Sequence, residues 1–340
     1  MQAIELSFII PVYNRPDEIE ELLQSFVTQT STVPFEVVIV EDGSSITSKH
    51  VVEAFTDRLR ISYYFKENSG PGDSRNYGMQ RAKGNYFIIL DSDCILPEDY
   101  IEKALKNLKD HYADCFGGPD AAHESFSNLQ KAINFAMTSF ITTGGIRGGK
   151  TSVGSFQPRS FNMGLSKTAF EVSGGFGTIH PGEDPDLSIR LNKLGFKTVL
   201  YPTVKVYHKR RISWRKFYQQ VHKFGMVRPI LNQWHPETQK ITYWFPSLFC
   251  LGFLMAVVGL VLGYVGPIIV FGLYFVLAFV LSLIQSKHLL VALQSVLAIG
   301  IQFFGYGYGF IKTTWLVGVL KKAPEQALPN LFFKQHDTGH

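Results

Sequence analysis

The sequence predicts an α/β domain with a mostly parallel sheet, followed by a basic segment and an apolar helical tail. Two observations carry this prediction. In the first hundred residues, short apolar runs alternate with segments whose apolar residues recur at helical spacing. In residues 241–311, a stretch of 71 residues, the only charged side chain is Lys287. A globular domain therefore precedes a region suited to a membrane.

Charge is distributed unevenly along the chain, although the formal net charge is only +5. Residues 1–204 carry 19 basic and 25 acidic side chains, whereas residues 205–240 carry nine basic side chains against Glu237 alone. This partition excludes a disordered protein and a wholly soluble enzyme. We expect an α/β domain over residues 1–208, a basic amphipathic collar over 209–240, a transmembrane helical region over 241–320 and a polar tail over 321–340.

The elements of the first domain are expected in the following order. Continuous apolar runs predict strands at Leu6–Val12, Phe35–Val40, Ile61–Phe65 and Tyr86–Leu90, and a last strand is expected near residues 198–206. Helices are expected from Pro16, over residues 72–83, from Pro97 to about Asp110 and from Glu183. In these strands apolar residues do not alternate with polar ones, and helices separate the strands. This pattern indicates a parallel sheet covered by helices on both faces. The stretch at 117–160, with its glycines at 144–149, is less periodic and is interpreted either as a mobile loop over a site or as an irregular surface connection.

Polar side chains follow three of these strands at the point where each strand ends. They are Asn14, Asp42 and the pair Asp91 and Asp93. Ligands of open α/β sheets bind beyond the carboxyl ends of the strands. The sequence therefore predicts a ligand site at this edge of the sheet.

The apolar tail divides into segments at residues 244–265, 268–285 and 289–311, each about long enough to cross a bilayer. The basic collar and the Lys287-His288 turn favour the cytoplasmic side, and the uncharged turn at 264–267 favours the outside. Three crossings would leave Lys312, Lys321 and Lys322 outside, against the usual charge bias. Either the third segment turns back with residues 313–320, or one segment lies in the interface; the sequence leaves both readings open.

The first part of the chain also lacks secretory and disulfide features. Three cysteines are too few for a disulfide framework, and the first 14 residues have neither the basic start nor the long apolar core of a signal peptide. We therefore expect the α/β domain to lie in the cytoplasm.

The Asp91-Ser92-Asp93 triplet is the strongest chemical signal. Two carboxylates spaced two residues apart on a strand share one side, and paired hard oxygens suit Mg²⁺ or Mn²⁺ held together with a diphosphate. Asp42 can accept hydrogen bonds from a nucleobase, and Arg75 can contact the same nucleotide. The loop after the first strand, with Pro11, Tyr13 and Asn14, is where a base or ribose would lie.

The order of these pieces resembles glycosyltransferase family 2, the inverting transferases with the GT-A fold, over nearly all of residues 4–225. The resemblance rests on five blocks: Pro11-Val12-Tyr13-Asn14, Asp42-Gly43-Ser44, the block from Asn68 through Gly72 to Arg75-Asn76-Tyr77-Gly78, Asp91-Ser92-Asp93, and Gly182-Glu183-Asp184-Pro185-Asp186-Leu187.

The resemblance implies a role for each block. Asp42 and Asp91 would bind the nucleotide together with Ser92, Asp93 would hold the metal, and Asp184 would be the general base. Glu183 would orient the acceptor or support the base. Acids in a first helical turn also suit the helix dipole, which is the plainer reading of Glu183 and Asp184.

Several residues near the basic collar have a possible role in the site, and that of His208 can be interpreted in two ways. In some relatives of the family a histidine placed as His208 completes the metal site, whereas a solvated histidine is the alternative. Arg211, Trp214, Gln220 and Lys223 are expected on the acceptor or membrane side. The segment Gln220-Val221-His222-Lys223-Phe224 stands where processive members carry Gln-x-x-Arg-Trp, and its changed residues argue against processive synthesis.

The expected function is a metal-dependent transferase using Mn²⁺ or Mg²⁺. It would move a sugar from a nucleotide diphosphate sugar, by resemblance a UDP-sugar, to a hydroxyl of a glycan or lipid-linked acceptor. This would take place at the cytoplasmic face of the inner membrane, in cell-surface polysaccharide synthesis. The rivals are a polyprenyl-phosphate sugar synthase, whose ionised acceptor needs no base, and a non-catalytic sensor of nucleotide sugars. A nucleic-acid partner is discounted, and the oligomeric state is left open.

Overall fold

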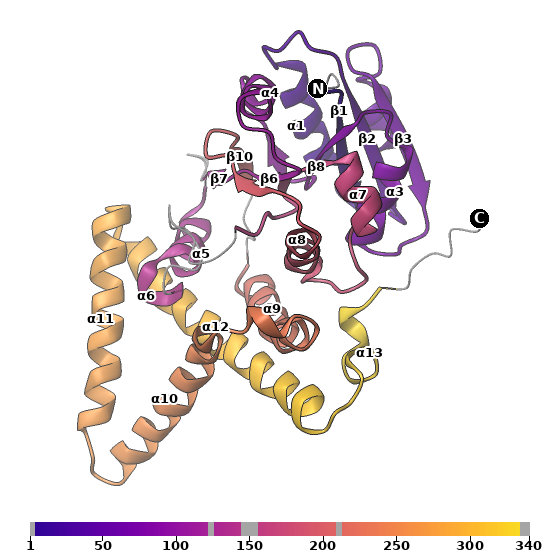
Figure 1. The fold of residues 1–340 in the computed structure, drawn as a ribbon. Coiled ribbons are helices and arrows are strands. Elements are labelled where there is room, and N and C mark those ends of the chain that lie inside the picture. The colour runs from indigo at the N-terminus through magenta and orange to yellow at the C-terminus, as the bar shows by residue number, and fades with distance from the viewer. Residues whose placement is uncertain (1–3, 122–125, 144–155, 209–212, 334–340) are drawn as a thin grey trace. The chain divides into compact units, whose positions relative to one another are not determined.

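The computed structural model describes residues 4–121, 126–143, 156–208 and 213–333 (Figure 1). The chain forms two compact units. The first contains residues 1–123, 155–209 and 332–340, and the second contains residues 124–154 and 210–331. Residues 124–154 thus group with the helical tail, whereas the predicted boundaries placed them in the first domain.

The first unit is built on a mostly parallel sheet of seven strands in the order β3-β2-β1-β4-β8-β6-β9. Strand β8 runs antiparallel to both of its neighbours, and the other pairs are parallel. The strands are β1 (Leu6–Val12), β2 (Phe35–Asp42), β3 (Ile61–Lys66), β4 (Tyr86–Leu90), β6 (Cys115–Gly117), β8 (Asn162–Ser166) and β9 (Thr198–Leu200). The predicted α/β class with a mostly parallel sheet is confirmed.

Helices cover both faces of this sheet (Figure 1). In β1, Phe8 and Ile10 pack with one helical layer while Ile9 packs with the other, which explains why the strand has no polar alternate. The helices of the unit are α1 (Pro16–Val27), α2 (Lys49–Glu53), α3 (Pro71–Arg81), α4 (Tyr100–Asp110), α7 (Lys167–Ser173) and α8 (Glu183–Lys193).

A second, small sheet has the order β5-β10-β7, formed by β5 (Cys94–Ile95), β10 (Val206–His208) and β7 (Asp120–Ala121). The single strand expected near residues 198–206 is therefore two short strands, β9 and β10, in different sheets. The turn at Pro202–Thr203 separates them, since proline cannot donate a ladder hydrogen bond.

The second unit is helical. Its elements are α5 (Asn128–Thr138), α6 (Phe140–Thr143), α9 (Trp214–Trp234), η1 (Pro236–Thr238), η2 (Ile241–Trp244), α10 (Phe245–Val261), α11 (Gly266–Ser286), α12 (Leu289–Thr313), the π-helix η3 (Thr314–Val319), α13 (Pro324–Ala327) and η4 (Pro329–Leu331). Three stretches are long and apolar enough to cross a membrane: Ile241–Val261, Gly266–Ser286 and Leu289–Val319.

Glycines bring α12 into close contact with α9. A Cβ at Gly309 would lie 2.4 Å from the carbonyl oxygen of His222, and one at Gly225 would lie 2.1 Å from the carbonyl oxygen of Tyr306. Because backbone atoms cannot move aside as side chains do, only glycine fits at these two positions. The two helices are therefore packed backbone to backbone.

This close packing predicts different effects for two glycines of α12. Gly309→Ala is expected to destabilise the protein by about 1–3 kcal/mol because the added methyl group overlaps the α9 backbone. Gly300→Ala, whose methyl group would meet no atom within 4 Å, is the matched control and should be neutral or stabilising by about 0.5–1 kcal/mol. Thermal unfolding of the full-length protein in detergent measures both, and equal effects would contradict the packing.

Candidate functional site

The parallel register brings the ends of β1, β2 and β4 to the same edge of the sheet. The loop with Asn14, the carboxylate of Asp42 and the segment beginning at Asp91 therefore gather at that edge, as the sequence predicted. This is the edge where open α/β sheets bind ligands.

Arg75 is the central buried charge of this region. The residue is 3% exposed, and its guanidinium donates to two carboxylates that come from distant parts of the chain. The Nη2 atom lies 2.8 Å from Oδ1 of Asp91, and Nη1 lies 3.1 Å from Oε1 of Glu183. Arg75 thereby ties the end of β4 to the first turn of α8.

The two acids that open α8 have opposite electrostatic surroundings. Burial alone would raise the pKa of Glu183, but the charge and hydrogen bond of His180, with Nδ1 2.9 Å from Oε1, and the charge of Arg75 lower it well below its usual value. Burial raises the pKa of Asp184 to about 6, and the neighbouring charge of Glu183 adds to the rise. The two adjacent carboxylates therefore differ in pKa. Glu183 is held ionised, whereas Asp184 can take up a proton near neutral pH.

Asp184 also keeps one carboxylate oxygen unused. Its side chain has a hydrogen bond with Ser160, and its backbone carbonyl accepts from the hydroxyl of Ser188 at 2.8 Å. The buried Oδ1 atom has no hydrogen-bond partner among the residues that the structure describes. An unpaired buried carboxylate oxygen is costly, so this atom is poised to accept a proton from an incoming donor.

Asp42 is almost wholly engaged with the protein. Its Oδ1 accepts from Nζ of Lys66 at 2.6 Å and from the backbone N–H of Ser69 at 3.0 Å, and its Oδ2 accepts from the backbone N–H of Gly70 at 3.0 Å. These bonds hold the loop that opens α3. Its expected contact with a nucleobase remains a prediction.

The loop after β1 is held in one shape by Asn14. This residue has a positive φ of 55°, and its side-chain oxygen accepts from the backbone N–H of Ile46 at 2.9 Å. Tyr13 beside it is 54% exposed, while Pro11 is half-buried in β1. An exposed ring next to a fixed loop can stack on a nucleobase, so the expected role of this loop stays a prediction.

The acidic triplet lies against two arginines. Asp91 binds Arg75, and Oδ2 of Asp93 lies 3.1 Å from Nη1 of Arg15. Ser92 between them is buried. Within the residues that the structure describes, no three His, Cys, Asp or Glu side chains gather as a ready metal site.

The oxygen atoms of the triplet are nevertheless suitable ligands for a divalent cation. Hard carboxylate oxygens at one strand end are the ligands that Mg²⁺ and Mn²⁺ prefer, and a diphosphate would complete the set. The backbone of His208 pairs opposite Cys94, the residue after Asp93, although the side chain of His208 lies outside the described part. The three predicted ligands therefore come from adjoining backbone positions.

Sequence reasoning missed three charged partners: Lys66, Arg15 and His180. Lys66 ends β3 directly opposite Asp42 in the register, so the rule of polar strand ends would have found it. The contacts of Arg15 and His180 join segments that no local pattern relates. The positions of these two residues in the sequence did not predict the contacts that they make.

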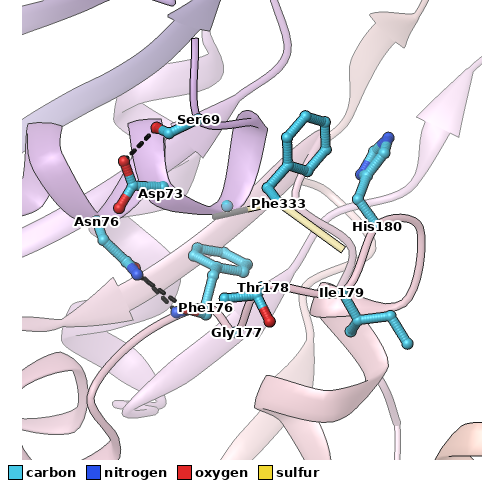
Figure 2. A pocket seen from close by; sticks show the side chains of 10 residues that line it. Ser69, Asp73, Asn76, Phe176, Gly177, Thr178, Ile179, His180 and Phe333 are labelled. Atoms are coloured by element: carbon cyan, nitrogen blue, oxygen red, sulfur yellow. Dashed lines mark hydrogen bonds between the residues drawn. The ribbon is translucent and has the colours of Figure 1, made fainter. Parts of the chain in front are cut away.

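A small cavity of about 10 Å³ lies beside His180, between Phe176 and Phe333 (Figure 2). It has room for about one water molecule and is too small for a sugar nucleotide. Phe333 reaches it because its backbone N–H donates to the carbonyl of Thr178 at 3.0 Å. No sequence pattern predicted that Phe333 packs beside Thr178 and His180.

The acceptor-side residues are placed only in part. Arg211 lies outside the described residues. Trp214 begins α9, and Gln220 and Lys223 follow along the same helix of the second unit. Their expected role remains a prediction.

Replacing Arg75 tests its importance for the site. Arg75→Gln is expected to destabilise the protein by about 3–5 kcal/mol because it leaves the carboxylates of Asp91 and Glu183 without their shared cation. Arg81→Gln at the exposed end of the same helix loses cation–π contacts with Tyr77 and Tyr64 and a 3.2 Å hydrogen bond to the carbonyl of Tyr77, together about 1 kcal/mol. Thermal unfolding in detergent compares the two, and a larger loss for Arg81→Gln would contradict the central role of Arg75.

Known proteins share features with this chain. Residues 7–171 match the family model "Glycosyl transferase family 2". Glycosyltransferase GlyA of Streptococcus pneumoniae is 35% identical over 111 residues, covering 32% of this chain and 16% of that protein. Poly(ribitol-phosphate) beta-N-acetylglucosaminyltransferase TarS of Staphylococcus aureus is 31% identical over 114 residues, covering 33% of this chain and 20% of that protein. The chain thus spans no more than a fifth of the length of these two relatives.

One solved structure resembles the fold over most of its length. The mannosyltransferase PcManGT from Pyrobaculum calidifontis, in complex with GDP-Man and Mn²⁺, has a TM-score of 0.56 and 16% identity, covering 91% of this chain and 87% of that one. At this identity the likeness concerns the fold alone. Residues 7–171 therefore resemble family 2 glycosyltransferases in sequence, and the fold resembles that of this mannosyltransferase.

Proposed function

We propose that this protein is an inverting glycosyltransferase. It transfers a sugar from a nucleotide diphosphate sugar to a hydroxyl group of a glycan or lipid-linked acceptor at the membrane. The observation that carries the proposal is the state of Asp184: a raised pKa and an unpaired carboxylate oxygen, one residue from the ion-paired Glu183. A structural first-turn acid would be expected to be paired or exposed, whereas a general base needs a vacant oxygen and a pKa near neutral.

The reaction is a single displacement. The acceptor hydroxyl oxygen attacks the anomeric carbon, the bond from that carbon to the diphosphate oxygen breaks, and the proton passes to Oδ1 of Asp184. Attack from the side opposite the leaving group inverts the configuration, so an α-linked donor gives a β-linked product. Glu183 stays ionised beside His180 and Arg75, and its negative charge keeps Asp184 basic.

The donor is held at the strand-end edge. Tyr13 and Asn14 border the nucleobase. Arg75 and Asp91 connect the donor edge to helix α8, which carries the general base Asp184. Asp91 and Asp93, with His208 from the adjoining strand, are the residues that would hold Mn²⁺ or Mg²⁺. Such a cation stabilises the charge of the departing diphosphate as a Lewis acid. The Mn²⁺ and GDP-Man of the similar mannosyltransferase structure support this cofactor and donor class.

The acceptor class follows from the base and the tail. A phosphate acceptor is already ionised near pH 7 and needs no base, so a poised Asp184 favours a hydroxyl over a polyprenyl phosphate. Three apolar stretches favour a site at a membrane. The basic side chains of residues 205–240 favour the cytoplasmic face for the transferase domain. The relative TarS is a poly(ribitol-phosphate) beta-N-acetylglucosaminyltransferase, which supports a polymer as the acceptor.

Asp184→Asn is expected to reduce transfer at least a hundredfold because the amide cannot take the proton. Donor binding, measured by calorimetry with UDP- and GDP-sugars, should persist. Asp17→Asn is the matched control, since Asp17 is the exposed second residue of α1 as Asp184 is the second residue of α8. Products are identified by mass spectrometry from a screen of nucleotide sugars against membrane lipid extract.

Two further readouts separate lost chemistry from misfolding. The folded protein holds the Asp184 proton to a higher pH than the unfolded chain does, so this group lowers the stability of the fold as the pH rises from about 4 to 6. The Asp184→Asn variant should therefore unfold at no lower temperature than the wild type at pH 7.5. Transfer to a phosphate acceptor at the wild-type rate by this variant would instead identify a polyprenyl-phosphate synthase.

The rate of transfer is expected to depend on pH through Asp184. The base must be ionised, so activity should rise as pH passes through about 6 and level off above 7. Initial rates at saturating donor between pH 5 and 8 measure the midpoint. A rate that is flat across this range would contradict the base assignment.

Metal removal is the last prediction of the mechanism. Chelation with EDTA should abolish transfer, and added Mn²⁺ should restore it. Asp93→Asn should weaken Mn²⁺ binding at least tenfold in an electron paramagnetic resonance titration with UDP or GDP present, whereas Asp57→Asn at an exposed turn should not. Full activity in EDTA would contradict a metal-dependent reaction.

A further inference from the structure

The three apolar stretches of the second unit differ in how far the protein covers them. In the most apolar 18-residue window of each stretch, 11% of the residues are buried for Ile241–Val261 and for Gly266–Ser286, but 39% for Leu289–Val319. A crossing helix surrounded by lipid exposes most of its apolar side chains to the bilayer. Helices α10 and α11 have this character, whereas other parts of the protein cover more than a third of the α12 window.

The second half of α12 packs against a charged helix. Gly305 and Gly309 contact Val221 and His222 of α9, and the His222 ring stacks on Tyr308 with centroids 5.4 Å apart. Helix α9 carries four cations, two of them on exposed residues: Arg215, Lys216, Lys223 and Arg228. Such a helix cannot lie in the hydrocarbon, so the part of α12 that packs on it lies outside the bilayer core as well.

The chain then returns to the first unit. Phe332 forms an antiparallel bridge with Ile179, and the backbone N–H of Phe333 donates to Thr178. The Phe333 ring covers Gly70 so closely that a Cβ there would lie 2.3 Å away. These contacts belong to the compact unit that carries Asp184, which is too polar to enter a bilayer. The chain leaves this unit near residue 209 and rejoins it at 332, so it crosses the membrane an even number of times.

We propose that α10 and α11 cross the bilayer as a two-helix hairpin and that α12 lies in the interface, between α9 and the lipid. The apolar stretch that includes α10 and the helix α11 have 21 residues each, about 31 Å at 1.5 Å per residue, which matches the hydrocarbon thickness. The two helices run in opposite senses around the turn at residues 262–265 in Figure 1. The surface that they expose is a lipid-binding surface.

The charges agree with this arrangement. The turn at residues 262–265 has no charged side chain and falls on the far side. Lys287, Lys312, Lys321 and Lys322 all fall on the side of the basic collar, which the positive-inside bias favours. Helix α12 is joined to the near end of α11 by a hydrogen bond of 2.8 Å between the hydroxyls of Ser282 and Ser295. Three crossings would instead put three of these lysines on the far side.

Single cysteines at exposed positions test the topology in the full chain. Asp57→Cys marks the side of the first unit, Tyr264→Cys the far turn, and Lys287→Cys and Lys321→Cys the two ends of the α12 region. Each variant is labelled with a membrane-impermeant maleimide in intact cells and in inverted membrane vesicles. The unsubstituted chain, whose Cys94 and Cys115 are buried, gives the background. Carbonate extraction first establishes that each variant is integrated in the membrane.

Residues 57, 287 and 321 should be labelled from one side and residue 264 only from the other. Labelling of 321 from the side of 264 would establish an odd number of crossings and overturn the proposal. Labelling of 264 from the side of 57, with 287 on the opposite side, would overturn it in favour of a hairpin of α11 and α12. The measurement needs no substrate, so its outcome is independent of the proposed transferase activity.

Discussion

The buried guanidinium of Arg75 is the interaction on which the site depends. Removing a cation from water is expensive, and here the cost is offset only because Asp91 and Glu183 both reach it, at 2.8 and 3.1 Å. The ring of Phe176, with its centroid 5.3 Å from the guanidinium carbon, provides a further favourable contact. Helix α3, the end of β4 and the start of α8 must therefore occupy fixed positions together.

This constraint explains why Asp184 has its unusual character. Arg75 and His180 stabilise the charge of Glu183, and that charge opposes ionisation of the next residue. Asp91 and the acids that open α8 are thus electrostatically linked through one side chain. A substitution at any of these positions is felt at the others, so their effects on activity should not be additive.

The central strands could be predicted from the sequence because their signals are local. Leu6–Val12 and Tyr86–Leu90 are continuous apolar runs, and both strands have the expected bounds. Strand β8 could not be predicted, since Asn162-Met163-Gly164-Leu165-Ser166 has no strong apolar pattern and its place is decided by antiparallel pairing with β4 and β6. The acids at the strand ends were predicted in the same local way, and Asp184 through the family resemblance, whereas the partners Arg15 and His180 depend on contacts between distant segments.

The division into units has a consequence for the way the protein can be produced. The chain passes between the two units four times, because residues 124–154 leave the first unit and return, and residues 210–331 do so again. A fragment that stops at residue 208 would keep α5 but remove α12, so Ile133 and Ala136, now buried in the helical core, would face water. It would also lack the Phe332–Phe333 segment that pairs with Thr178 and Ile179. A truncation at residue 208 therefore leaves both compact units incomplete.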